Sequence, residues 1–166
     1  RERHGTLLVD HMRALDLYLL GFWQAAAYLV PYSLGFDELR KPVPYFDKFG
    51  IRMPDVYDDM QGENGNQNIN GIDRYRTTIA HMAAHRRWTT AIFADNFSPF
   101  QRMAIECFED ARVETLAMRK YPGLRRLFVT QHPQPKEGDC NSETHSCLRH
   151  RLAMLSRALL DPADAP

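Results

Sequence analysis

The stretch Asn96-Phe97-Ser98-Pro99-Phe100-Gln101 decides the fold, because it ends one long helix and begins another. Ser98 is a suitable N-cap residue, and Pro99 fits the first helical position, where no backbone N–H donor is needed. Gln101 can reach back to the backbone of Ser98 and complete a capping box. We therefore expect a helix from Pro99 to about Lys120, and a second helix on the other side of the stretch.

Apolar residues at helical spacing indicate three further helices. The helix before the quoted stretch should begin with Asp73 as its N-cap and end near Asp95. Another should run from residue 6 to residue 31, and a last one from residue 147 to residue 160. Residues 31–71 are rich in proline and glycine and predict a loop-rich insertion, whose aromatic residues should pack on the core. No segment shows a convincing strand pattern.

The expected fold class is mainly α, with about four long helices and a loop-rich insertion. A length of 166 residues suits a single helical domain over residues 1–166, which we interpret as a piece of a longer chain. The 21 basic and 21 acidic side chains balance, so charge favours neither nucleic acid nor a membrane as a partner. Leu17–Val30 is too short to span a bilayer, and three cysteines suggest a reducing cytoplasm.

The segment His81-Met82-Ala83-Ala84-His85 places two histidines four residues apart on the helix expected over residues 73–95. Side chains at this spacing stand on one face, close enough for both imidazoles to reach one metal ion. Zinc metallopeptidases with an HExxH motif have a glutamate after the first histidine, where it acts as general base. Here that position is Met82, which cannot take a proton from water. The pair therefore predicts metal binding without peptide hydrolysis.

The helix expected from Pro99 carries Glu106, Glu109 and Asp110 within about one turn. A short connection should place it antiparallel beside the preceding helix, so one carboxylate could face His81 and His85. We take His81, His85 and Glu109 as candidate metal ligands, leave the choice among the three carboxylates open, and expect Zn²⁺. The alternative is that both histidines are ordinary helix residues, hydrogen-bonded to those carboxylates.

Arg112 has mainly a structural interpretation. Arg112 lies close to Glu109 and Glu114, and we expect it to pair with carboxylates as a packing contact.

A second possible zinc site consists of five residues near the end of the chain, namely His132, Cys140, His145, Cys147 and His150. Its cysteine spacing matches no standard zinc motif, so a plain loop with incidental cysteines is the favoured interpretation.

Three runs together resemble a known family: Gly71 to His85, Glu109-Asp-Ala-Arg-Val-Glu114, and Tyr121-Pro-Gly-Leu124. They are similar to the region that precedes the von Willebrand A domain in NorD-type nitric-oxide reductase activation proteins and CbbO-type Rubisco-activase subunits. The resemblance covers roughly residues 70–160. A more distant likeness, in Glu109, Arg112 and Glu114, is to the cobaltochelatase subunit CobT.

The resemblance implies a non-enzymatic adaptor that works with a hexameric MoxR-type AAA+ ATPase to remodel or activate a client, either Rubisco or nitric-oxide reductase. The paired helices would then be a degenerate zincin-like core that serves as a scaffold or docking surface. The alternative function is a zinc-dependent metallohydrolase whose general base comes from elsewhere, such as Glu109 or Asp110. Met82 separates the two hypotheses.

Overall fold

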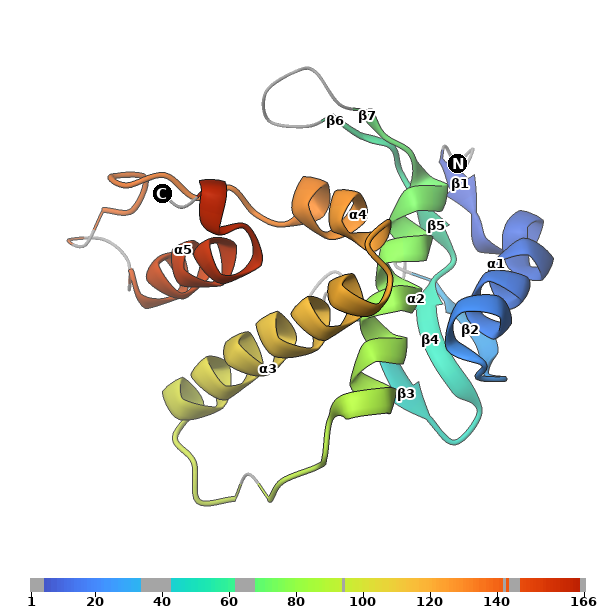
Figure 1. Cartoon of the computed structure of the whole chain (residues 1–166), viewed down its shortest axis with the longest axis horizontal. Coiled ribbons are helices and arrows are strands. Elements are labelled where there is room, and N and C mark those ends of the chain that lie inside the picture. The colour runs from blue at the N-terminus through green and yellow to red at the C-terminus, as the bar shows by residue number, and fades with distance from the viewer. Residues whose placement is uncertain are drawn as a thin grey trace. The chain divides into compact units, whose positions relative to one another are not determined.

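The computed structural model describes residues 5–33, 43–61, 68–93, 95–141, 143 and 147–164. The chain divides into two compact units, residues 1–86 and residues 87–166, called here the N-terminal and C-terminal units. Helices dominate the described residues, which confirms a mainly α fold class (Figure 1). The prediction of a single domain over residues 1–166 stays a prediction.

The N-terminal unit combines two helices with three small sheets. Helix α1 spans Leu8–Trp23 and α2 spans Gly71–Trp88, whose last two residues belong to the C-terminal unit. The largest sheet has the strand order β2, β4, β3, with β2 (Tyr28–Tyr32) parallel to β4 (Gly50–Pro54) and β3 (Tyr45–Asp47) antiparallel to β4. Two antiparallel pairs complete the unit, β1 (Thr6–Leu7) with β5 (Val56–Tyr57) and β6 (Met60–Gln61) with β7 (Asn68–Ile69).

The prediction of one helix over residues 6–31 was wrong. Helix α1 ends at Trp23, Gln24 adopts a left-handed conformation with φ of 50°, and the chain continues into β2, beside α1 (Figure 1). Strand β2 is stabilised by ladder hydrogen bonds to β4, in a register that pairs Tyr28 with Gly50. Gly50 has a φ of 143°, and a Cβ atom there would collide with the carbonyl oxygen of Tyr28. A partner more than twenty residues away decides this strand, so local periodicity cannot reveal it.

The expected loop-rich insertion holds short strands instead of irregular chain alone. Strands β3 to β7 all lie between residues 45 and 69, which contradicts the expectation that no strands form. Residues 34–42 and 62–67 of this insertion lie outside the described part. Of the aromatic residues expected to pack on the core, Tyr57 does so, with its ring centroid 4.6 Å from that of Tyr75, whereas Phe49 is exposed.

Tyr75 joins α2 to two strands of the N-terminal unit. Its side chain is fully buried, with a relative exposure of 0%, and its hydroxyl group has two carbonyl acceptors within hydrogen-bond distance. The hydroxyl oxygen is 3.0 Å from the carbonyl oxygen of Pro54 in β4 and 3.3 Å from that of Thr6 in β1. Burial raises the pKa of Tyr75 above its usual value, so the neutral hydroxyl is the form that donates.

Helix α2 begins earlier and ends earlier than the sequence pattern suggested. The side-chain oxygen of Asn70 accepts a hydrogen bond from the backbone N–H of Asp73 at 2.8 Å, so Asn70 makes the contact expected of an N-cap. Asp73 instead lies inside the first turn, where it is buried and forms an ion pair with Arg76 at 3.1 Å. The helix stops at Trp88, several residues before Asp95.

The C-terminal unit contains the helices α3 (Pro99–Lys120), α4 (Leu124–Gln131) and α5 (Leu148–Leu160), with a short 3-10 turn at Pro162–Asp164. The bounds of α3 are those predicted, and both hydrogen bonds of the capping box between Ser98 and Gln101 are present. Helix α5 also forms where it was expected. Helix α4 was not predicted, because the eight-residue segment after Pro122-Gly123 is too short to show a clear period.

The core of this unit lies where α3 packs against α4 and α5. The buried apolar side chains are Ala111, Val113, Ala117, Leu124, Leu127, Phe128 and Leu160. Arg157 of α5 is also buried and donates a hydrogen bond of 2.7 Å to the carbonyl oxygen of Val129, which connects α5 to α4. Among the residues that the structure describes, no helix is both long and apolar enough to cross a membrane.

Replacing the hydroxyl of Tyr75 tests the connection between α2 and the strands. We expect Tyr75→Phe to lower the free energy of unfolding by about 1–2 kcal/mol, because two buried carbonyl oxygens lose their donor. Urea unfolding followed by circular dichroism measures the change. Tyr28→Phe is the matched control. Tyr28 is exposed, so the loss of its hydroxyl group should change the free energy of unfolding by less than about 0.5 kcal/mol. Equal effects of the two substitutions would contradict the role given to Tyr75.

Candidate metal-binding residues

His81 and His85 stand together on α2, as the sequence predicts. Their ring centroids are 4.6 Å apart, with the rings inclined at 70° to each other. Both side chains are half-buried. A separation of one helical turn brings both imidazoles within reach of one ion, and their partial exposure leaves that ion a route from solvent.

The three residues between the histidines lie inside the fold. Met82 has a relative exposure of 8%, and Ala83 and Ala84 are also buried. The thioether of Met82 is at most a weak hydrogen-bond acceptor and has no acid–base chemistry near neutral pH. The position that holds the general base in a zinc peptidase is therefore both chemically inert and removed from water.

Glu109 of α3 is held in a clamp by Arg112. The guanidinium group donates from Nε to Oε2 and from Nη2 to Oε1 of Glu109, each at 2.7 Å. Nη2 of Arg112 also donates to the backbone oxygen of Trp88 at 2.8 Å, and the hydroxyl of Thr89 donates to Oε1 of Glu109 at 2.6 Å. The hydrogen bonds to Glu109 raise the pKa of Arg112. The predicted pairing of Arg112 with Glu109 is confirmed, whereas a pairing with Glu114 stays a prediction.

These contacts bear on the choice of carboxylate that the sequence leaves open. Both oxygens of Glu109 already accept charge-assisted hydrogen bonds, so metal coordination by Glu109 competes with Arg112 for the same lone pairs. Glu106 is exposed and Asp110 is half-buried. His81 and His85 belong to the N-terminal unit, and the three carboxylates belong to the C-terminal unit. Two imidazoles and one carboxylate form a donor set suited to a divalent ion.

Thr89 and the carbonyl group of Trp88 were missed by the sequence analysis, although they complete the clamp. The signal that could have found them is their position directly after the histidine pair, where a helix ends. The last carbonyl groups of a helix lack partners within it and carry partial negative charge, so they favour a guanidinium donor. The boundary predicted at Asp95 instead of Trp88 hid this end.

The second possible zinc site is not formed in this structure. Cys140 and Cys147 are joined by a disulfide, with Cα atoms 5.7 Å apart, so neither sulfur is a thiolate ligand. The ring of His132 contacts the carbonyl oxygen of Pro133 at 2.8 Å and the hydroxyl of Ser156 at 2.9 Å. His145 lies outside the described residues.

The expectation that these cysteines are incidental was also wrong. The two sulfurs are bonded to each other, which a C-x₆-C spacing alone does not specify. His150, on the following helix α5, has a buried Nε2 atom for which the described residues provide no hydrogen-bond partner.

Cys107 is the free cysteine of the chain, in helix α3. Its thiol is 3.4 Å from the carbonyl oxygen of Leu152 in α5, to which it donates. Burial raises the pKa of the Cys107 thiol, so little of the reactive thiolate is present at neutral pH. Cys107 is therefore a packing residue between two helices.

A comparison of this chain with models of protein families, with characterised proteins and with solved structures found no match.

Alkylation distinguishes the three cysteines. In the oxidised protein, iodoacetamide should react slowly with Cys107, because its thiol is partly buried and its pKa is raised, and should not react with Cys140 or Cys147. In urea without reductant the reaction at Cys107 should become fast, while the other two stay protected. Adding reductant in urea should label all three, and mass spectrometry identifies each site. Labelling of Cys140 or Cys147 without reductant would contradict the disulfide.

Proposed function

We propose that this chain is a domain of a non-enzymatic activation protein that works with a MoxR-type AAA+ ATPase. The ATPase hexamer would supply the energy to remodel a client, either Rubisco or nitric-oxide reductase, and this domain would act as a scaffold between them. The proposal rests on the resemblance of three runs, above all Glu109-Asp-Ala-Arg-Val-Glu114, to activation proteins of the NorD and CbbO types.

Met82 is the observation that carries the choice of an adaptor over an enzyme. A zinc peptidase needs a carboxylate at this position to take a proton from the metal-bound water. A thioether offers no effective proton acceptor, and Met82 is buried, with a relative exposure of 8%. The histidine pair therefore keeps the ligands of a metallopeptidase helix without its base.

The rival hydrolase needs a general base from another residue. Glu109 suits this role poorly, because both of its oxygens accept hydrogen bonds from the permanently charged Arg112. A carboxylate held in this way is stabilised as an anion and is a weak proton acceptor. Asp110 is the remaining candidate, but a carboxylate that coordinates the metal cannot at the same time act as the base.

We further propose that His81, His85 and the carboxylate of Asp110 bind one structural Zn²⁺ ion. Asp110 takes the place that the sequence analysis gave to Glu109, because the clamp with Arg112 occupies Glu109. Mixed nitrogen and oxygen ligands suit zinc, which tolerates four-coordinate sites with a water as the fourth ligand. In this proposal, the helices carrying the ligands are a degenerate zincin-like pair, and the ion stabilises them.

Balanced charge is the reason that we propose neither nucleic acid nor a membrane among the partners. A cytoplasmic location is part of the same proposal, since MoxR-type ATPases need ATP. Disulfides are rare in a reducing cytoplasm. A cytoplasmic chain would therefore hold Cys140 and Cys147 as thiols inside the cell and form their bond on oxidation.

Metal analysis tests the ligand set directly. Purified protein dialysed against trace zinc should contain about one zinc per chain, measured by atomic emission. His85→Ala and Asp110→Asn should each lower the zinc content several-fold, because each removes one of three protein ligands. Glu106→Gln, on the same helix as Asp110, and His132→Ala are matched controls that should leave zinc content unchanged. Full zinc content in the Asp110→Asn protein would exclude Asp110 as a ligand.

The adaptor proposal is tested by ATPase stimulation and by peptidase assays on the same preparation. With a MoxR-type ATPase encoded beside the parent gene, the full-length parent protein should raise the rate of ATP hydrolysis, and deletion of residues 70–160 should abolish this effect. The 166-residue chain should cleave no casein in the presence of zinc. Zinc-dependent cleavage that is lost in His81→Ala would overturn the adaptor proposal in favour of the hydrolase.

A further inference from the structure

A pocket with a volume of about 310 Å³ opens beside the C-terminal half of α1, within the N-terminal unit. Its lining comes from two consecutive segments, the last turns of α1 and the chain that leads into β2. The lining residues are Asp16, Leu19, Leu20, Ala25, Ala26, Ala27 and Tyr28. Its volume is at the lower end of the range for small-molecule sites, about 300–1,000 Å³.

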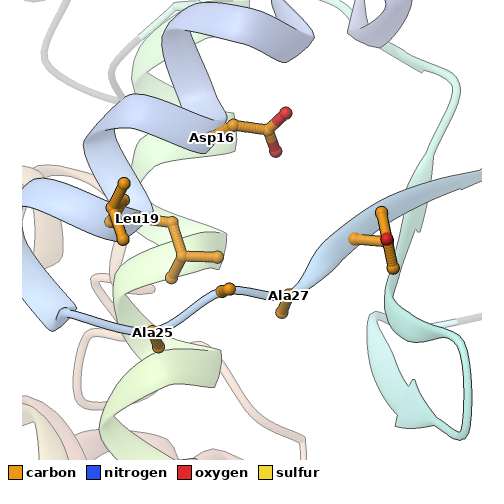
Figure 2. A pocket seen from close by; sticks show the side chains of 7 residues that line it. Asp16, Leu19, Ala25 and Ala27 are labelled. Carbon is orange, nitrogen blue, oxygen red and sulfur yellow. The ribbon is translucent and has the colours of Figure 1, made fainter.

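The pocket exists because of how α1 ends. The left-handed conformation of Gln24 turns the chain back, so that Ala25–Ala27 runs beneath the helix before β2 begins. Three successive alanines carry only methyl groups, which leaves the space beneath α1 open. Figure 2 shows Leu19 pointing down toward this segment and Asp16 projecting from the helix above it.

The wall of the pocket is apolar with one charged group. Leucine and alanine side chains form most of the lining, and Asp16 supplies a carboxylate. Asp16 is exposed, and its partial removal from water raises the pKa of its carboxyl group. None of the residues that line the pocket carries a positive charge, so a cation from outside would compensate this carboxylate.

Tyr28 adds a second feature that favours a cation. Tyr28 is one of the lining residues and is 82% exposed, so its aromatic ring is accessible to a ligand. Aromatic faces carry partial negative charge and attract ammonium groups within about 6 Å of the ring centroid. An anion would be repelled by both the carboxylate and the ring face, and a neutral apolar molecule would leave the carboxylate without a partner.

We propose that this pocket binds the ammonium group of an organic amine with a short apolar chain. The ammonium group contacts the carboxylate of Asp16 and the ring of Tyr28, and the methylene chain lies on the leucine and alanine side chains. The amine is either a small free molecule or the side chain of a lysine in a partner protein, since both present a primary ammonium on about four methylene groups. This site is separate from the histidine pair, so the proposal stands or falls independently of metal binding.

The first experiment titrates the ¹⁵N-labelled 166-residue chain with butylammonium chloride and follows the backbone amides of Ala25, Ala26 and Ala27. We expect saturable shifts of these amides. 1-Butanol has the same number of heavy atoms without the charge, and butyrate carries the opposite charge, so both should bind more weakly. Equal affinity for butylammonium and 1-butanol would overturn the proposal, because the charge would then contribute nothing.

Two substitutions assign the contacts. Asp16→Asn should raise the Kd for butylammonium about fivefold, as expected for a partly exposed charge pair. Asp10→Asn, on the same helix but outside the pocket, is the matched control and should leave the Kd unchanged. Tyr28→Leu should raise the Kd about threefold if the ring contributes a cation–π contact. An unchanged Kd in Asp16→Asn, with the amide spectrum otherwise preserved, would overturn the proposal.

A second titration arm distinguishes the two sources of the ammonium group. N-acetyl-lysine N-methylamide presents a lysine side chain in a peptide context, and its neutral ε-acetyl form is the control. Shifts at Ala25–Ala27 with the lysine compound that match those with butylammonium support a protein lysine as the ligand. Shifts with butylammonium alone support a small free amine, because the peptide groups then do not fit. Binding of neither compound contradicts the proposal.

Discussion

The hydroxyl of Tyr75 makes the contact on which the N-terminal unit depends. It connects α2 to the carbonyl groups of β4 and β1, two strands nearly fifty residues apart in the chain. The side chain is fully buried and needs hydrogen-bond partners within the protein, so its two acceptors fix both the depth and the rotation of α2. Because the rotation of α2 is fixed, Met82 lies inside and the histidines lie at the partly exposed face.

The rotation of α2 also explains why the candidate metal ligands and Met82 lie on different faces of the helix. His81 and His85 lie on one face of the helix, and their ring centroids are 4.6 Å apart. Met82 follows His81 by about 100° around the helix and so falls on the buried face, where an apolar residue contributes to packing. A glutamate there would bear the cost of burying a charge unless a metal-bound water compensated it. An apolar residue is therefore the more stable choice at this buried position.

Within the C-terminal unit, Arg112 fixes the position of the Glu109 carboxylate. One guanidinium group contacts both oxygens of Glu109 and the carbonyl oxygen of Trp88, so it joins a side chain of α3 to the last residue of α2. Sequence proximity was enough to predict the pair of Arg112 with Glu109, since residues three apart on a helix are neighbours. It was not enough to show that Arg112 also contacts the carbonyl oxygen of Trp88 and occupies both oxygens of Glu109.

The sequence by itself determined those features whose interactions are local. The capping box at Ser98 and the bounds of α3 followed from residues within one turn, and the spacing of His81 and His85 fixed their common face. Only the tertiary structure decided where α1 ends, that β2 pairs with β4, that Cys140 and Cys147 join, and that a pocket forms under α1. Each of these features depends on groups that the tertiary fold brings together. The contacts between such groups cannot be recognised from a local window of sequence.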